Sequence, residues 1–475
     1  MAYASLAMLA FRCQFFSTRV SVTVGLFWVA EYCPSITLIE KFANKFDYLM
    51  QKLEINRNRL LADISALGAI GADGDRGVFR SAFSDAEMQA REWFKRRVES
   101  VGLNFYVDGA ANMHARLPMQ SRKTQGSASS TAEQTSPAAV MTGSHLDTVP
   151  GGGHLDGALG VLAGLEALRC LKAHAVPLKR DVEVIAFTDE EGAFGGMFGS
   201  QALTGQLTDA QIAAMMNKQG ELLTSRMSAC GFDPALIQRA KRKPGSIHAF
   251  VELHIEQGPV LERMGHRVGM VDGIAGQVKW MVNLVGKANH AGTTPMAMRA
   301  DAFQGVAEIA MQIDEVLAAA GSDASVATIG YLDLVPGATN VIPGEAKFSL
   351  DIRDVDNSVL QRLSEAFKAR IEKIAGKRGL TFEISELVSL AGVRSESKVM
   401  AAIERACDLF NEPGYCMPSG AVHDTQIMAS VTRTGMIFIP SIGGISHASL
   451  ERSDVEDIVL GANVLLNTLV SLAND

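Results

Sequence analysis

Three short apolar segments of this chain each end close to side chains that bind metal ions. Residues 139–142, 182–187 and 249–253 are mainly apolar, and each run is followed within three residues by His, Asp or Glu. Leucines with helical spacing follow the first run, between residues 160 and 173. Strands that alternate with helices predict an α/β fold with a mainly parallel sheet, whose functional groups lie at the carboxyl ends of the strands.

The pattern of apolar residues changes near residue 268. Four strands and two helices follow, which predict an inserted α+β domain over residues 268–389. We expect the first domain to comprise residues 48–267 and 390–475. The strands of the inserted domain are expected at 276–285, 325–334, 345–352 and 381–389, and its helices at 300–318 and 357–375.

Residues 1–47 form an N-terminal extension. Residues 1–30 contain two arginines and no acid, as in an organelle transit peptide, and the apolar run 20–30 is compatible with a signal peptide. That run is shorter than the roughly 20 residues of a membrane span. An upstream start codon, with the functional chain beginning near Met50, is a third alternative. Residues 120–138 are rich in Ser, Thr and Gln and predict a mobile surface loop.

The composition agrees with a soluble enzyme. Hydrophobic residues make up 47% and charged residues 20% of the 475 residues, and the length suggests more than one domain. The net charge of -8 disfavours a nucleic-acid partner. Six scattered cysteines without a CxxC pair predict reduced thiols. We expect a cytoplasmic location, or an organelle if the extension is a transit peptide, and no membrane partner.

Five separated segments together supply a complete set of metal ligands. They are Gly-Ser-His-Leu-Asp at 143–147, Leu-Asp-Gly at 155–157, Thr-Asp-Glu-Glu-Gly at 188–192, Glu-Leu-His-Ile-Glu at 252–256 and Ile-Ser-His-Ala at 445–448. Their imidazoles and carboxylates suit two divalent cations bridged by one carboxylate, with zinc, manganese, cobalt or nickel as candidates. The candidate ligands are His145, Asp156, Glu191, His254 and His447.

Two further acids in these segments have different expected roles. Asp147 follows His145 by two residues, so on an extended strand end both side chains point to the same side. We therefore expect Asp147 to orient the imidazole of His145 rather than to bind a metal. Glu190 is adjacent to Glu191, faces a different direction, and is left free beside a ligand.

These motifs, in this order, resemble the metal-dependent aminoacylase and carboxypeptidase superfamily. The resemblance runs from about Ile55 to the C-terminus and is to the amidase branch of N-carbamoyl-amino-acid hydrolases, β-ureidopropionases and allantoate amidohydrolases. It implies that His145 and His254 bind one metal ion, Glu191 and His447 the other, and Asp156 both. It also implies that Glu190 is the general base, and that the inserted domain is a lid and dimerisation domain of a homodimer.

The same resemblance implies a set of substrate-binding residues. His290 matches the histidine that polarises the scissile carbonyl, often from the partner subunit, and Asn340 and Arg353 match residues that hold the substrate carboxylate. An arginine offers a planar, two-pronged donor for such a carboxylate. We also expect Gln257 to bind the ureido group, and Gly420 and Ala421 to present backbone groups to the substrate.

The function predicted from these residues is hydrolysis of the C–N bond of N-carbamoyl amino acids. The substrate is an N-carbamoyl-L-amino acid or N-carbamoyl-β-alanine, and the products are the amino acid, carbon dioxide and ammonia. An allantoate or ureidoglycolate amidohydrolase is the alternative, and a peptidase or aminoacylase is third. A catalytically silent binding scaffold is disfavoured, because Glu190 and all five ligands are present.

Overall fold

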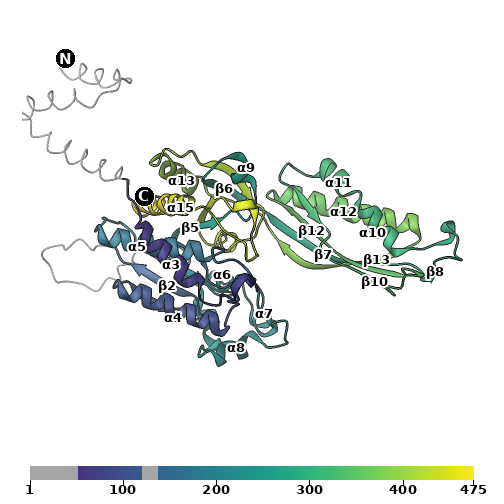
Figure 1. Cartoon of the computed structure of the whole chain (residues 1–475), viewed down its shortest axis with the longest axis horizontal. Coiled ribbons are helices and arrows are strands. Elements are labelled where there is room, and N and C mark those ends of the chain that lie inside the picture. Colours follow the sequence, from purple (N-terminus) through teal and green to yellow (C-terminus); the bar gives the residue numbers. More distant parts are fainter. Residues whose placement is uncertain (1–51, 120–136) are drawn as a thin grey trace, which may run out of the picture. The chain divides into compact units, whose positions relative to one another are not determined.

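The structure is a computed structural model that describes residues 52–119 and 137–475 (Figure 1). The predicted extension 1–47 and nearly all of the predicted loop 120–138 lie outside the described residues.

The first domain is built on a sheet of nine strands among the described residues. Their order is β1-β2-β4-β3-β5-β16-β6-β14, with β15 paired to β6. Strands β4, β3, β5 and β16 are mutually parallel, so their carboxyl ends meet at one edge. The bounds are β1 (Asn104–Val107), β2 (Met113–Leu117), β3 (Ala139–His145), β4 (Val182–Phe187), β5 (Ile247–Ile255), β6 (Gly269–Ile274), β14 (Val393–Arg394), β15 (Tyr415–Ser419) and β16 (Arg433–Ile439).

Helices cover both faces of this sheet, which explains why its central strands β3, β4 and β5 are buried along nearly their whole length. Val140 and Val184 join one core with the helices of the first face, while Met141 and Ile185 join a second core with two short helices. The first face carries α3 (Arg57–Gly68), α4 (Asp85–Ser100), α5 (Ala158–Ala173), α13 (Ser397–Asp408) and α15 (Val455–Ala473); the second carries α6 (Phe198–Thr204) and α14 (Asp424–Met428). This arrangement confirms the predicted α/β class.

Helix α15 is long and apolar enough to cross a membrane by length and composition, but 67% of it is buried in the protein. It packs against α5, α13, β5 and β16, so its apolar character is that of a core helix.

Shorter elements complete the first domain. They are α7 (Asp209–Ala214), α8 (Leu223–Ala229), α9 (Val260–Met264) and the 3-10 turns η1 (Gly74–Arg76), η2 (Pro234–Ala240) and η4 (Ile442–Gly444).

The inserted domain has its own sheet, with the order β10-β12-β7-β13 and β9 also paired to β12. Side chains alternate along β7: Trp280, Val282 and Leu284 pack under the helices, and the intervening residues lie on the open face. The elements are β7 (Gly276–Val285), β8 (Asn289–His290), η3 (Met296–Met298), α10 (Ala302–Ala310), α11 (Ile313–Ala320), β9 (Val326–Thr328), β10 (Leu332–Val335), β11 (Val341–Ile342), β12 (Glu345–Asp354), α12 (Asn357–Arg378) and β13 (Thr381–Leu390).

Three details of the inserted domain differ from the prediction. Strand β6, which the predicted boundary at residue 268 placed in this domain, pairs with β16 of the first sheet. The predicted strand 325–334 is divided into β9 and β10, because three residues (329–331) lie opposite two residues of β12 (349–350) and the register shifts by one. Gly330 and Tyr331 stay bonded there to the hydroxyl and backbone N–H of Ser349. The predicted helix 300–318 is divided into α10 and α11.

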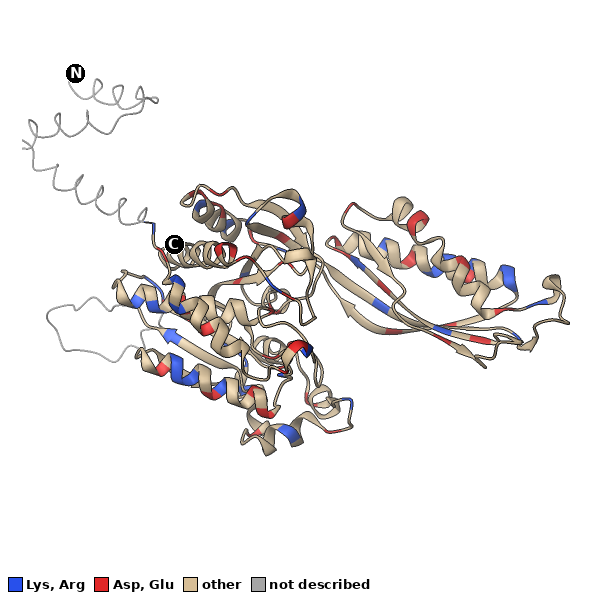
Figure 2. Ribbon diagram, in the orientation of Figure 1, with Lys and Arg blue, Asp and Glu red and all other residues tan. Residues whose placement is uncertain are grey.

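Charged residues of both signs are interspersed along the outer helices α4 and α12 (Figure 2). The buried side of α12 is apolar and includes Leu363, Phe367 and Ile371. This helix is therefore amphipathic, with its apolar face on the sheet.

Candidate metal centre

Three imidazoles surround the carboxylate of Asp156 at the carboxyl edge of the first sheet. Oδ1 of Asp156 lies 3.1 Å from Nε2 of His254 and 3.7 Å from Nε2 of His145. Oδ2 of Asp156 lies 3.3 Å from Nε2 of His447. His145 is the last residue of β3 and His254 lies near the end of β5, so the parallel strands bring two of the three imidazoles together.

The predicted ligands form two groups that share Asp156. One group contains His145 and His254 and the other Glu191 and His447, with the ligand atoms of each group within 4.8 Å of one another. Two ligands bonded to one tetrahedral ion at 2.0–2.2 Å are about 3.3–3.6 Å apart. The separations of 3.1 to 3.8 Å between these side-chain atoms lie around that range. Two of the four groups of possible ligands in the described structure therefore match the division between two metal ions that the family pattern implies, while a third group, His145 with Glu190 and Glu191, crosses it. The assignment of the five ligands stays a prediction.

The electrostatics of this centre also fit a bound cation. Burial raises the pKa of Glu191 to about 7, and its Oε1 atom is buried without a hydrogen-bond partner. Burial, and next the charge of Asp424, raise the pKa of Glu190 well above its ordinary value. An unpaired buried carboxylate oxygen costs free energy, and a cation placed against it would remove that cost.

The turn before α5 places Asp156 beneath the histidines and requires glycine at its next position. Gly157 has a φ of +66°, in the left-handed region. A Cβ atom on Gly157 would lie 2.4 Å from Nε2 of His145, so any other side chain would displace that imidazole.

Glu451 connects the two loops that carry Asp156 and His447. Its Oε1 atom accepts hydrogen bonds from the backbone N–H groups of Leu155 and Asp156, each at 3.0 Å. Its Oε2 atom accepts from the hydroxyl of Ser446 at 2.9 Å, and that hydroxyl also lies 2.9 Å from Oδ2 of Asp156. Glu451 is 2% exposed. A buried carboxylate therefore holds the bridging acid and a histidine loop in one arrangement.

The structure corrects the role predicted for Asp147. Nδ1 of His145 lies 2.9 Å from the backbone carbonyl of Asp147, whereas the carboxylate is 3.8 Å from that nitrogen. The carboxylate instead accepts hydrogen bonds from the backbone N–H groups of Glu190 at 3.4 Å and Glu191 at 3.1 Å. The backbone of Asp147 thus orients the imidazole, and its side chain positions the acidic pair.

Gln257 lies at the metal centre itself. Its Nε2 atom donates to Oδ2 of Asp156 at 2.8 Å and lies 3.3 Å from Nε2 of His447. Its Oε1 atom is buried without a hydrogen-bond partner. A ureido group bound by this amide would therefore lie next to the carboxylate of Asp156. The predicted role of Gln257 stays a prediction.

Arg353 of the inserted domain lines the same cavity as the metal ligands. This cavity has a volume of about 740 Å³ and includes Asp156, Glu190, Glu191, His254 and His447 in its wall. Gln277 and Lys279 of β7 line it as well. A substrate held at the metal centre could therefore reach the guanidinium of Arg353.

The loop between β15 and α14 contributes to this cavity differently from the prediction. Ala421 lines the cavity, and its backbone N–H is already paired with the hydroxyl of Ser419 at 3.2 Å. The carbonyl of Gly420 accepts a hydrogen bond from Nη1 of Arg353 at 2.7 Å. Gly420 therefore holds the arginine through its carbonyl.

His290 and Asn340 are not among the residues that line this cavity. Both are exposed, and they belong to or adjoin the pairing of β8 with β11, where Ala291 N–H donates to the carbonyl of Asn340 at 2.9 Å. Strand β7 begins near the cavity with Gln277 and ends at Val285, which is about 26 Å further along the strand at 3.3 Å per residue. His290 follows Val285 in the chain. Within one chain, the structure therefore does not bring His290 and Asn340 to the metal ligands.

Sequence reasoning missed Glu451, Asp351, Lys279 and Gln277. The period of two in β7 and β12 was a signal for the last three, because it places Gln277 and Lys279 on the face that carries Arg353. Glu451 carries no comparable signal, since an acid four residues after His447 resembles any solvated loop acid.

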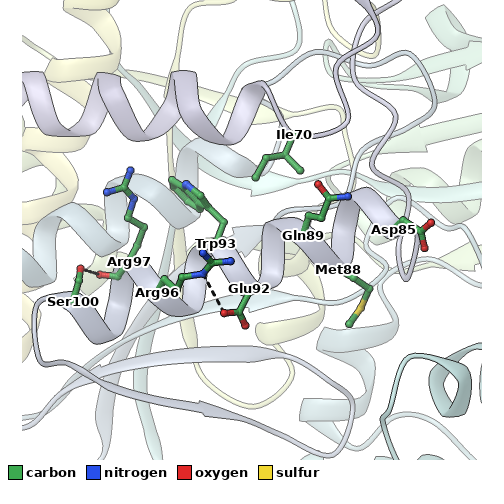
Figure 3. Close-up of a pocket in the computed structure, with 9 residues that line it drawn as sticks. All are labelled: Ile70, Asp85, Met88, Gln89, Glu92, Trp93, Arg96, Arg97 and Ser100. Atoms are coloured by element: carbon green, nitrogen blue, oxygen red, sulfur yellow. Dashed lines mark hydrogen bonds and ion pairs between the residues drawn. The ribbon is translucent and has the colours of Figure 1, made fainter.

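A second hollow lies on the surface of α4 and contains none of the predicted site residues (Figure 3). It has a volume of about 920 Å³ and is lined by Ile70, Trp93 and charged residues of α4. Arg97 lies over the Trp93 ring and pairs with Asp63, while Arg96 pairs with Glu92. The two arginines of this hollow are thus paired with acids of the protein, whereas Oε1 of Glu191 at the candidate metal centre has no hydrogen-bond partner.

Comparison with known proteins agrees with this geometry. The N-carbamoyl-L-amino acid amidohydrolase of Geobacillus stearothermophilus is 39% identical over 423 residues, covering 88% of this chain and 99% of that protein. The allantoate amidohydrolase of Escherichia coli strain K12 is 35% identical over 410 residues, covering 86% of this chain and 96% of that protein.

A solved structure and a family model give the same result, and the resemblance seen in the five motifs is confirmed. An amidase of the hydantoinase/carbamoylase family from Burkholderia multivorans has a TM-score of 0.80 at 30% identity, covering 90% of this chain and 100% of that one. Residues 141–471 match the model of peptidase family M20/M25/M40. With candidate metal ligands grouped at the carboxyl edge of the first sheet and relatives that align over nearly their full length, the chain belongs to peptidase family M20/M25/M40.

Proposed function

We propose that this protein hydrolyses N-carbamoyl amino acids to the amino acid, carbon dioxide and ammonia. The observation that carries the proposal is a single cavity lined by Glu190, by the guanidinium-bearing Arg353 and by four of the five candidate ligands, namely Asp156, Glu191, His254 and His447. The metal centre suits hydrolysis of a C–N bond, and the arginine suits a carboxylate on the same substrate. The relative at 39% identity is named for this reaction.

The chain's own residues divide the work as follows. Two divalent ions per subunit (zinc, manganese, cobalt or nickel) would supply an acidified water and polarise the ureido carbonyl when bound. Glu190 takes the proton from the attacking water and returns it to the leaving nitrogen. Arg353 holds the carboxylate, so that the ureido group is placed at the ligands.

His290 has the tautomer that this reaction needs. Its Nδ1 atom accepts hydrogen bonds from the backbone N–H groups of Gly292 at 3.0 Å and Thr293 at 3.2 Å. Its proton is therefore on Nε2, which can donate to an oxygen as negative charge develops. We infer that His290 and Asn340 complete the site of the partner subunit in a homodimer, because neither lines the cavity of its own chain.

Allantoate is the second candidate substrate. It also carries a ureido group and a carboxylate, and the Escherichia coli relative at 35% identity is named for it. The metal centre and Arg353 serve both substrates, so side-by-side kinetics must discriminate between them. A silent scaffold is disfavoured by the presence of Glu190 and all five ligands in the described structure.

The test measures ammonia release from N-carbamoyl-L-alanine, N-carbamoyl-β-alanine and allantoate in parallel. We expect the highest kcat/KM for one of the two N-carbamoyl amino acids. Chelation should abolish turnover and a divalent ion should restore it. A higher kcat/KM for allantoate would replace the proposed substrate, and full activity in a preparation shown by elemental analysis to be metal-free would refute the metal-dependent reaction.

A further inference from the structure

Arg353 belongs to a cluster of four polar side chains on the open face of the inserted sheet. In the antiparallel pairing of β7 with β12, Gln277 lies opposite Arg353 and Lys279 lies opposite Asp351. Their neighbours Val278, Trp280, Leu350 and Ile352 belong to or pack against the core under the helices. Because successive side chains of a strand alternate, all four polar residues lie on the other face.

Asp351 is the common acceptor of this cluster. Its carboxylate accepts from Nε of Arg353 at 3.1 Å and Nη2 at 3.2 Å, and from Nε2 of Gln277 at 2.7 Å. The ammonium of Lys279 lies 3.3 Å from the same carboxylate. Burial acts to raise the pKa of Asp351, but the hydrogen bond and charge of Arg353 and the charge of Lys279 outweigh it and lower that pKa. Asp351 is therefore ionised at neutral pH.

The donors of Arg353 are only partly used by the protein. A guanidinium has five N–H donors, and three of them are taken by the two bonds to Asp351 and the bond to the Gly420 carbonyl. Two N–H groups remain, which is the number that a carboxylate accepts in a bidentate pair. The bonds to Asp351 and Gly420 also fix the guanidinium plane, so little side-chain freedom is lost on binding.

The charges of the cluster leave one positive charge unbalanced. Lys279 and Arg353 are two cations, and Asp351 is the one anion paired with them. One substrate carboxylate would neutralise this excess.

Both cations face the substrate space. Lys279 and Arg353 line the cavity of the metal ligands, and they also line a neighbouring cavity of about 560 Å³ above β9 and β12. Strand β13 borders the metal cavity, and β9 borders the neighbouring cavity. Strands β7 and β12, which carry the two cations, lie between them in the sheet. The two cations therefore lie at the boundary where a carboxylate extending from the metal centre would arrive.

We propose that Lys279 is a second carboxylate-binding residue, and that Asp351 is a positioning residue that holds Lys279 and Arg353 for that carboxylate. The inference rests on the proposed function and deepens it, since it makes a carboxylate at this position a requirement for efficient substrates.

The test compares Lys279→Met with Lys347→Met, both in the metal-loaded enzyme. Lys347 lies on the same face of the sheet but further along β12, is exposed, and is not among the lining residues of either cavity. The substrates are N-carbamoyl-L-alanine and N-carbamoyl-L-alaninamide, in which a neutral amide replaces the carboxylate. For Lys279→Met we expect KM to rise about tenfold on the carboxylate substrate with little change in kcat, and no rise on the amide. Lys347→Met should match the wild type on both.

Asp351→Asn tests the positioning role separately. It should raise KM for N-carbamoyl-L-alanine by about tenfold or more, while KM for the amide, metal content and unfolding temperature stay near wild type. For Lys279→Met, an equal rise in KM on both substrates, or an unchanged KM for N-carbamoyl-L-alanine, would overturn the inference. That outcome holds even if Asp351→Asn fails to fold. A wild type that hydrolyses neither substrate would overturn the proposed function, and this inference with it.

Discussion

At the scale of single residues, Glu190 is the acid whose loss should affect chemistry alone. Glu190→Gln keeps the size of the side chain but removes the base, so kcat should fall by about a hundredfold or more. Metal content should stay unchanged, because Glu190 is not one of the five predicted ligands. The measurement is steady-state kinetics together with elemental analysis.

Glu256→Gln is a matched control for that variant. Glu256 is also a buried glutamate close to a predicted ligand, but it accepts from the backbone N–H groups of Val260 and Leu261 at the start of α9. We expect turnover of Glu256→Gln to stay within a few-fold of wild type. Near-normal turnover in Glu190→Gln would assign the base to another group.

Glu451 should control metal affinity without touching a metal. Glu451→Gln leaves one oxygen acceptor for the N–H groups of Leu155 and Asp156 and places an amide against the Ser446 hydroxyl. Loss of such a supporting bond weakens metal binding by about ten- to a hundredfold. Competition with a chelator, measured on the purified variant, checks this value. Unchanged metal affinity would show that the two loops hold their arrangement without Glu451.

At the scale of elements, a buried polar network joins β1, β2 and β4. Nδ1 of His114 lies 2.7 Å from Oε1 of Glu183, and the hydroxyl of Tyr106 donates to the same oxygen at 2.6 Å. Burial acts to lower the pKa of His114, but hydrogen bonds to Asp108 and Glu183 outweigh it and raise that pKa. Burial acts to raise the pKa of Glu183, but the hydrogen bond and charge of His114 outweigh it and lower that pKa.

This network predicts a pH dependence of folding stability. The contribution of His114 is fully present below its ordinary pKa of 6.5 and is lost as pH rises through the raised value. The contribution of Glu183 is present above its ordinary pKa of 4.5 and is lost as pH falls through the lowered value. The free energy of unfolding of the wild type, measured with urea, should therefore decline as pH rises above 6.5 and as pH falls below 4.5. His114→Gln should flatten the decline above pH 6.5, and an unchanged slope in that variant would assign the decline to other groups.

At the scale of the whole molecule, we predict that the proposed homodimer pairs through β10, an edge strand of the inserted sheet. It exposes apolar side chains, with Leu332 at 42% and Val335 at 47% exposure, and Tyr331 beside it at 48%. An apolar edge strand favours pairing with another copy, and a charge on it opposes that pairing. Leu332→Lys should shift the solution mass toward one chain and reduce activity. Leu387→Lys on β13, 52% exposed in the wild type, is the control and should stay dimeric.

Subunit mixing tests whether His290 acts across that dimer. His290→Ala and Glu190→Gln should each be nearly inactive alone. In a two-fold dimer, each hybrid would regain one intact site, so an equimolar mixture should recover about a quarter of wild-type activity. Native mass spectrometry confirms subunit exchange in the same sample. Exchange without recovery would mean that His290 does not act in the partner's site.

The sequence by itself determined the α/β class and the composition of the candidate metal centre. His145 and His254 lie at or near the ends of strands that are apolar on both faces, and such strands are recognisable from local composition. Parallel strands bring their carboxyl ends to one edge, so His145 and His254 converge without any further information. The predicted elements of the inserted domain follow from the same local periods, although the structure starts that domain after β6 and divides two of its predicted elements.

The tertiary structure alone decided which groups touch. Glu451 reaches the Asp156 loop from 295 residues away, and the side chain of Asp147 holds the backbone of Glu190 rather than the imidazole of His145. Asp351 joins Lys279 to Arg353 only because β7 and β12 pair in one register. Local periodicity gives the face on which a side chain lies, whereas the partner opposite it depends on strand register and loop closure across the whole fold. Those long-range choices determine which acids lie at the candidate metal centre, which accept hydrogen bonds from the backbone, and which lie beside the cations proposed to bind the substrate.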